Sequence, residues 1–268
     1  MIAPSTRPEP DPALVARLRA AGCVFAEDEA ALLTEAAAGS EVELERLAAR
    51  RVAGEPLEPL LGWAEFAGMR LRVEPGVFVP RHRTELLAER AAQEAMARPG
   101  ATVLDLCCGV GAIGAVVLQR VPGVRLFAAD IEPAAVRCAR ANLEPDGRVF
   151  EGDLFSALPG ALRGGLDVIA VNAPYVPTRE IPRMPPEARD HEPAVALDGG
   201  GDGLDVHRRI AAEAADWLAP SGVLLIEASD EQAPVSAALF EAAGLAVAVE
   251  QDDERGSTLV IARAAASS

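Results

Sequence analysis

The chain has few of the features that build disulfide-linked or membrane-spanning proteins. Its 268 residues include only four cysteines, two of them adjacent at Cys107 and Cys108, which is not the framework of a secreted disulfide protein. No apolar run approaches the ~20 residues that a membrane helix needs, and the first residues lack the charged start and apolar core of a signal peptide. We therefore expect a soluble, cytoplasmic protein with no membrane contact.

Positive charge and histidine are also scarce. The chain has 25 Lys and Arg residues against 41 Asp and Glu residues, and its formal net charge is -16. An acidic surface repels phosphate backbones, so the composition argues against a nucleic-acid substrate. The three histidines, His82, His191 and His207, lie far apart without metal-ligand spacing. We expect no metal site, and we interpret the two adjacent cysteines as small residues that fill a crowded turn.

Apolar residues make up half of the chain, and their pattern changes twice. Residues 1–54 predict a small domain of three helices at 12–22, 28–38 and 40–54. Asp11 is the predicted first N-cap, and Ser40 with Glu43 predicts a capping box for the third helix. Residues 55–84 contain GWAEFAGMRLRVEPGVFVP, whose alternation and Gly/Pro punctuation predict a β-hairpin linker. Residues 85–268 form the third predicted domain.

Strands and helices alternate from residue 101 onward. TVLDL, RLFAAD, RVFEGDLF and LDVIAVNAPY are predicted strands, a long irregular segment spans 176–205, and GVLLIEAS, LAVAVEQ and STLVIARA follow. Such alternation favours a mostly parallel sheet with helices on both faces. The short polar turn DDERG makes the final pair antiparallel. The predicted fold class is therefore α/β, a Rossmann-like seven-stranded sheet with an antiparallel last strand.

A glycine-rich turn follows the first of these strands. The segment CCGVGAIGAVV places Gly109, Gly111 and Gly114 between the strand and the next helix. Glycine allows positive φ and close approach of a ligand, and the helix start offers free N–H groups. Ligands of open α/β sheets bind at this carboxyl edge, so the turn is a predicted cofactor loop.

Three carboxylates end three successive predicted strands, and these are Asp105, Asp130 and Asp153. Asp130 can accept both hydroxyls of a ribose, and Asp153 can face an adenine edge. The glycine spacing with Asp130 also matches the dinucleotide fingerprint, which is weak by itself. However, Asp105 would oppose a pyrophosphate, whereas it suits the ammonium of a methionine moiety. The pattern favours S-adenosylmethionine, and an NAD-dependent dehydrogenase is the alternative.

The fourth strand ends in Asn172-Ala173-Pro174-Tyr175. An amide nitrogen is a poor nucleophile, so a site that methylates it must hold it in line with the methyl donor. The Asn172 side-chain oxygen and the carbonyl of residue 173 can fix an NH2 group, and Pro174 favours the extended conformation that aims this carbonyl. Tyr175 can stack on the planar group. The motif therefore predicts an acceptor clamp for a planar nitrogen.

With these residues in place, the chain resembles the protein glutamine-N5 methyltransferases of the HemK/PrmC family, which methylate the glutamine of the Gly-Gly-Gln motif in peptide-chain release factors. The resemblance runs from about Pro56 to the C-terminus. It is carried by FAGMRLRVEPGVFVPRHRTELL, DLCCGVGAIG, AADIEPAAV, GDLFSAL, NAPYVP and HEPAVALDGGGDGLDVHRRI. It implies S-adenosylmethionine as cofactor and a protein substrate with an exposed glutamine, bound by the N-terminal helical domain.

Motifs and resemblance together give the expected site residues. The expected cofactor-binding residues are Phe78, Arg81, Thr84, Asp105, Cys107, Cys108, Gly109, Val110, Gly111, Asp130, Ile131, Asp153, Leu154 and Asn172. The expected acceptor-binding residues are Asn172, Ala173, Pro174 and Tyr175, of which Asn172, Pro174 and Tyr175 are expected to be catalytic. His191-Glu192-Pro193 can border the acceptor pocket as part of a lid, or form a plain surface loop.

Four departures separate the chain from the family pattern. Ala173 stands where the family has proline, Cys107-Cys108 where it has Gly-Thr, Leu154 where an aromatic residue is common, and His82-Arg83 where it prefers Pro-Asp. We expect Cys107 to adopt an ordinary φ, as a cysteine at this position requires. Because the departures flank the expected pocket, other acceptors stay open: a small molecule, an exocyclic adenine amine, or none in a cofactor-binding scaffold.

Overall fold

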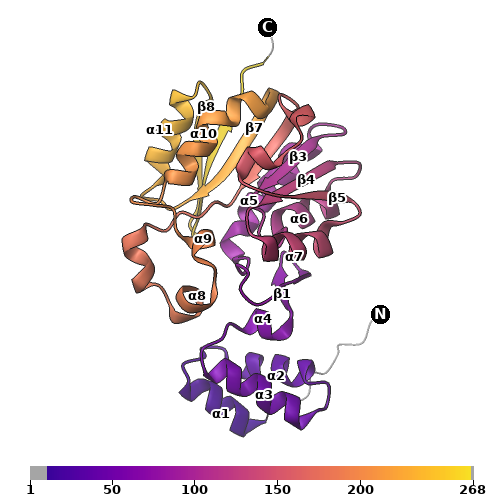
Figure 1. Ribbon diagram of the computed structural model, residues 1–268, viewed down its shortest axis with the longest axis vertical. Helices are drawn as coiled ribbons and strands as arrows, with labels where there is room; N and C mark the ends of the chain where they lie inside the picture. Colours follow the sequence, from indigo (N-terminus) through magenta and orange to yellow (C-terminus); the bar gives the residue numbers. More distant parts are fainter. Residues whose placement is uncertain (1–10, 267–268) are drawn as a thin grey trace.

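The computed structural model describes residues 11–266, and its N-terminal part is a small helical unit set apart from the sheet (Figure 1). The unit consists of α1 (Pro12–Ala20), α2 (Ala26–Ala36) and α3 (Glu41–Val52). Asp11 caps α1 by accepting from the Ala13 N–H at 2.9 Å, as expected. Ser40 accepts from the Glu43 N–H at 3.3 Å, but Glu43 pairs with Arg46, so only half of the capping box forms.

The segment between the helical unit and the sheet begins with a helix that the sequence analysis missed. This helix is α4 (Leu57–Leu61), and the hairpin strands β1 (Trp63–Phe66) and β2 (Met69–Arg72) follow it. Gly62 ends α4 in the left-handed conformation, with φ 80°, which glycine adopts at little cost. Leu60 of α4 packs into the core of the helical unit, so that core extends past residue 54.

A seven-stranded sheet forms the larger unit, which confirms the expected fold class. Its strands are β3 (Thr102–Leu106), β4 (Arg125–Asp130), β5 (Gly147–Glu151), β6 (Leu166–Val171), β7 (Leu218–Ala228), β8 (Ala246–Asp252) and β9 (Ser257–Arg263). They lie in the order β5-β4-β3-β6-β7-β9-β8. The last strand, β9, runs antiparallel to both of its neighbours, and the pairs from β5 to β7 are parallel.

Two hydrophobic cores cover the two faces of the sheet. On one face lie α5 (Glu85–Met96), α6 (Ala112–Arg120) and α7 (Pro133–Leu143), and on the other α10 (Asp205–Trp217) and α11 (Ala233–Ala242). Side chains of β3 alternate between them, because successive residues of a strand point to opposite faces: Val103 enters the first core and Leu104 the second. The strand order reverses between β3 and β6, where ligands of such sheets bind.

Several elements differ from their expected ends. Strand β6 ends at Val171 rather than at Tyr175, and β7 begins at Leu218 rather than at Gly222. Strand β5 ends at Glu151 rather than at Asp153, because Gly152 and Leu154 take positive φ and the chain turns away from the sheet. The segment 176–205 is less irregular than expected, since it contains α8 (Pro186–His191) and α9 (Ala194–Leu197). Among residues 11–266, no helix combines the length and apolar character of a membrane span.

Candidate functional site

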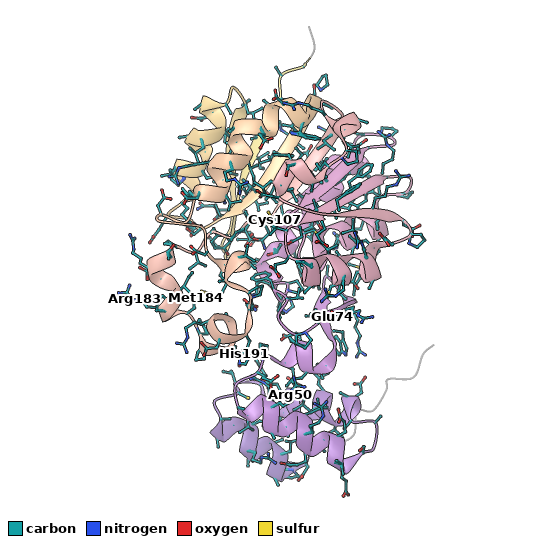
Figure 2. The ribbon with its side chains drawn as sticks, viewed as in Figure 1. Arg50, Glu74, Cys107, Arg183, Met184 and His191 are labelled. Carbon is teal, nitrogen blue, oxygen red and sulfur yellow. The ribbon has the colours of Figure 1, made fainter. Side chains whose placement is uncertain are left out.

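A cavity of about 430 Å³ opens at the carboxyl ends of β3, β4 and β6. Leu106, Asp130 and Asn172 reach it from the ends of these three strands. The segment 176–205 covers the cavity and is called the lid below. Figure 2 shows Cys107 within the sheet unit and Met184 on the projecting lid.

The cavity gathers most of the expected site residues. Those that line it are Phe78, Arg81, Cys107, Gly109, Asp130, Ile131, Asp153, Leu154, Asn172, Ala173, Pro174 and Tyr175. Those that the structure places outside its lining are Thr84, Asp105, Cys108, Val110 and Gly111. The second group forms a supporting layer, as the contacts of Thr84, Asp105 and Gly111 illustrate.

The glycine-rich turn is set by backbone conformation and close packing. Gly109 and Gly111 have φ of 54° and 81°, and a Cβ on Gly111 would lie 2.7 Å from Leu143 Cδ1. Cys107 also has a positive φ, 57°, so the expectation of an ordinary φ there was wrong. The turn imposes the left-handed conformation at residue 107 although cysteine has a Cβ that disfavours it.

Two of the expected acidic residues organise this turn. Asp130 accepts from the Gly109 N–H at 2.8 Å and from the Glu132 N–H at 2.9 Å, and burial raises its pKa. Asp105 is fully buried, and its Oδ2 accepts from the Gly114 N–H at 2.9 Å. Its Oδ1 has no partner among the described residues. Burial, with the nearby charge of Asp130, raises the pKa of Asp105 to about 8.

The third expected acid, Asp153, lies beyond its strand and is already paired. It precedes a 3-10 turn at Leu154–Ala157, and its Oδ2 accepts from Arg209 Nη2 at 2.6 Å. Arg209 comes from α10 and also lines the cavity. The sequence motifs did not single out Arg209, because tertiary packing decides which face of a helix points toward a cavity.

The acceptor motif follows β6, and Thr84 fixes the orientation of its first residue. Asn172 Nδ2 donates to Thr84 Oγ1 at 3.2 Å. The Asn172 Oδ1 atom and the Ala173 carbonyl accept no hydrogen bond from the described residues. Two acceptors of the same motif are thus left open beside the cavity, which is the pattern that an NH2 group needs.

Tyr175 is held at its hydroxyl, its ring and its backbone. The hydroxyl donates to Glu227 Oε1 at 3.3 Å, and the Arg83 guanidinium lies 5.6 Å from the ring centroid. Gln232 Nε2 donates to the Tyr175 carbonyl at 2.8 Å. Burial and the charge of Glu227 raise the pKa of the Tyr175 phenol. The ring is therefore a fixed, neutral wall of the cavity.

Phe78 and Arg81 form another part of the wall and are tied to the lid. The Arg81 guanidinium lies 4.9 Å from the Phe78 ring centroid, and its Nη2 donates to Glu192 Oε1 at 2.6 Å. Glu192 also accepts from the Val79 N–H at 3.3 Å. Glu192 is 7% exposed and Pro193 lines the cavity, so this part of the segment borders the cavity, as one of the two expectations had it.

The lid supplies a run of lining residues that the sequence analysis did not single out, namely Met184, Ala194, Val195, Ala196 and Leu197. Its two ends are joined where the Val176 N–H donates to the Leu197 carbonyl at 3.0 Å and the Gly199 N–H to the Val176 carbonyl at 2.9 Å.

Within residues 11–266, no group of three or more His, Cys, Asp and Glu side chains could hold a metal ion.

The chain is similar to known methyltransferases. Residues 68–184 match the family model described as Methyltransferase small domain. The release factor glutamine methyltransferase of Bradyrhizobium diazoefficiens is 38% identical over 256 residues, which cover 87% of this chain and 86% of the relative. That of Geobacter sulfurreducens is 37% identical, covering 80% and 75%. A 4-amino-L-phenylalanine/4-methylamino-L-phenylalanine methyltransferase of Streptomyces pristinaespiralis is 39% identical, covering 73% and 68%.

Solved structures share the fold. A methyltransferase of Pyrococcus furiosus superposes with a TM-score of 0.55 at 17% identity, covering 74% of this chain and 90% of that one. A 16S rRNA methyltransferase of T. Thermophilus, in complex with AdoMet and guanosine, gives a TM-score of 0.54 at 24% identity, covering 75% and 49%. At these identities the likeness concerns the fold alone.

Proposed function

The chain belongs to the release factor glutamine methyltransferase family, and on this premise we propose that it transfers a methyl group from S-adenosylmethionine to the side-chain amide nitrogen of a glutamine in a protein. The observation that carries the proposal is the orientation of Asn172. Its amide group donates to Thr84, which leaves Oδ1 and the Ala173 carbonyl as two acceptors for one NH2 group.

The cavity suits the proposed cofactor in size and in polar groups. Its volume of about 430 Å³ falls in the usual range for small-molecule sites. Each oxygen of Asp130 accepts one backbone N–H and keeps a lone pair for a ribose hydroxyl. Asp105 does not line the cavity, so its unpartnered Oδ1 would act on the ammonium end through a bridging water. When bound, S-adenosylmethionine would supply an electrophilic methyl group, and the acceptor nitrogen would give up one proton to water as S-adenosylhomocysteine is left behind, so the protein needs to provide no acid or metal.

The residues of this chain would act on the acceptor by holding it. Asn172 Oδ1 and the Ala173 carbonyl would each accept from one N–H of the acceptor amide, which restricts its rotation and orients its nitrogen. The fixed ring of Tyr175 would stack on the amide plane. Met184 and Val195 of the lid line the same cavity, and their apolar side chains would exclude water from the methyl donor.

We further propose that the acceptor glutamine belongs to a peptide-chain release factor and that the N-terminal helical domain binds it. The names of the relatives support the first part. Support for the second comes from the contact between the helical unit and the lid. Arg51 of α3 is 7% exposed and pairs with Glu29 of α2 and with Glu187 of α8, both at 2.7 Å. A protein bound to the helices would therefore lie beside the lid that borders the cavity.

A second candidate acceptor is the aromatic amine of a small molecule. The relative from Streptomyces pristinaespiralis acts, by its name, on such an amine and is 39% identical. An arylamine also presents a planar NH2 group, so Asn172 and Ala173 alone do not distinguish it from an amide.

The decisive experiment incubates the enzyme and labelled S-adenosylmethionine with a peptide containing Gly-Gly-Gln, with the same peptide carrying Glu for Gln, and with 4-amino-L-phenylalanine. We expect label only on the glutamine peptide, and mass spectrometry should place one methyl group on the side-chain nitrogen. The Asn172→Ala variant should lose at least about 100-fold in turnover, since both a contact and the amide orientation are removed. Its affinity for S-adenosylhomocysteine should fall only modestly, and near-normal turnover would refute the clamp.

A further inference from the structure

One short turn contacts both ends of the acceptor motif. This 3-10 turn, His82–Thr84, precedes α5. Thr84 Oγ1 accepts from Asn172 Nδ2 at 3.2 Å, and the guanidinium of Arg83 lies 5.6 Å from the Tyr175 ring centroid. Arg83 also lines the cavity. A single turn therefore orients the first residue of the motif and places a cation beside the last.

Glu227 fixes the direction of the Arg83 side chain. Arg83 Nε donates to Glu227 Oε1 at 3.1 Å, and Glu227 is 1% exposed. Glu227 lies at the carboxyl end of β7, beside Asn172, because Val171 pairs with Ile226 one residue earlier. Since only Nε is used, both Nη groups of Arg83 are without a hydrogen-bond partner among the described residues. A guanidinium held in this way offers a fixed pair of donors.

The proposed acceptor needs such a donor. A primary amide has two N–H donors, which Asn172 Oδ1 and the Ala173 carbonyl can match, and one oxygen, which must accept a hydrogen bond if it is buried. The Tyr175 hydroxyl already donates to Glu227. Arg209 pairs with Asp153 on the β5 side of the cavity. Of the cationic side chains that line the cavity, only Arg83 also contacts the acceptor motif.

We propose that Arg83 is a specificity-determining residue whose Nη groups donate to the acyl oxygen of the acceptor amide, and that Glu227 is a positioning residue that aims them. The inference rests on the proposed function and deepens it, because it assigns the third polar group of a glutamine side chain to a residue. It also gives the site a means of discrimination, since an arylamine has no acyl oxygen and would leave the Arg83 donors unmatched.

The test compares Arg83→Ala with a matched control, Arg179→Ala. Arg179 is an exposed lid arginine whose one ion pair within residues 11–266 is with Glu180, and it does not line the cavity. With the Gly-Gly-Gln peptide, Arg83→Ala should lower kcat/KM about 10- to 100-fold, as expected for a lost hydrogen bond to a charged donor. Its Kd for S-adenosylhomocysteine should change less than about two-fold, because Arg83 is assigned to the acceptor and not to the cofactor. The control should match the native enzyme in both measurements.

Glu227→Gln separates positioning from structural and charge effects. The Gln side chain keeps an oxygen that can accept from Arg83 Nε and the Tyr175 hydroxyl, so kcat/KM should stay within about three-fold of native. Glu227→Leu removes that oxygen, so its kcat/KM should fall as far as that of Arg83→Ala, while its affinity for S-adenosylhomocysteine should stay near native. If Arg83→Ala keeps native kcat/KM, or weakens cofactor binding as much as peptide turnover, the role of Arg83 is refuted while the proposed function stands. If the native enzyme methylates no glutamine peptide, the proposed function fails and the inference fails with it.

Discussion

Asp105→Asn tests the electrostatic state of the cofactor site, because the buried carboxyl has an unusual pKa. Burial raises the pKa of Asp105 from 3.8 to about 8, so the folded protein retains a proton that the unfolded chain loses. The free energy of unfolding therefore falls as the pH rises through the window from about 4 to about 8, by about 1.4 kcal/mol per pH unit. At pH 7 the cost to the unliganded protein reaches about 4 kcal/mol.

Asparagine removes this cost because it does not ionise, and its side-chain oxygen can still accept from the Gly114 N–H. We expect the unliganded Asp105→Asn protein to be close to native in stability at pH 4.5 and more stable than native at pH 8. Urea titrations at several pH values measure the free energy of unfolding directly. A difference between the two proteins that stays constant from pH 5 to pH 8 would refute the assigned pKa.

The same substitution should weaken the cofactor site, which separates stability from function. If Asp105 holds the ammonium end of S-adenosylmethionine, its ionised form is stabilised by the ligand, and binding at pH 7 releases a proton. Calorimetry with S-adenosylhomocysteine in buffers of different ionisation enthalpy should detect this release in the native enzyme. We expect the variant to lose the Asp105 contribution to proton release and about ten-fold or more in affinity. Unchanged affinity would exclude Asp105 from the cofactor contact.

Three further substitutions probe the glycine-rich turn and the carboxylate that organises it. Cys107→Gly should leave the free energy of unfolding unchanged or raise it by up to about 1 kcal/mol, because glycine adopts the positive φ of residue 107 without strain. Cys108→Gly, at a buried position without positive φ, should lower the free energy of unfolding. A lower free energy of unfolding in both variants would contradict the strain argument. Asp130→Ala should weaken S-adenosylhomocysteine binding about 10- to 100-fold, the effect of a lost charged hydrogen-bond partner; equal affinity in calorimetry would remove Asp130 from the ribose role.

Secondary structure was predictable where the periodicity is strong and the ends carry a clear signal. TVLDL and RLFAAD became β3 and β4 with the expected bounds, because buried apolar runs between glycine or charged residues have few alternatives. Short elements were less predictable. The sequence analysis missed α4, α8 and α9, whose four to six residues are too few to show helical periodicity and depend on packing against the rest of the chain.

The sequence by itself determined which residues follow the strand ends. Asp130 and Asn172 meet in one cavity because parallel strands bring their carboxyl ends to one edge of the sheet. Only the tertiary structure decided how those groups are used. It placed Asp153 against Arg209, forced Cys107 into a left-handed conformation, and set Arg83 on Glu227 across 144 positions of sequence. Such pairings depend on how helices, turns and strands pack in three dimensions, which local sequence patterns do not encode.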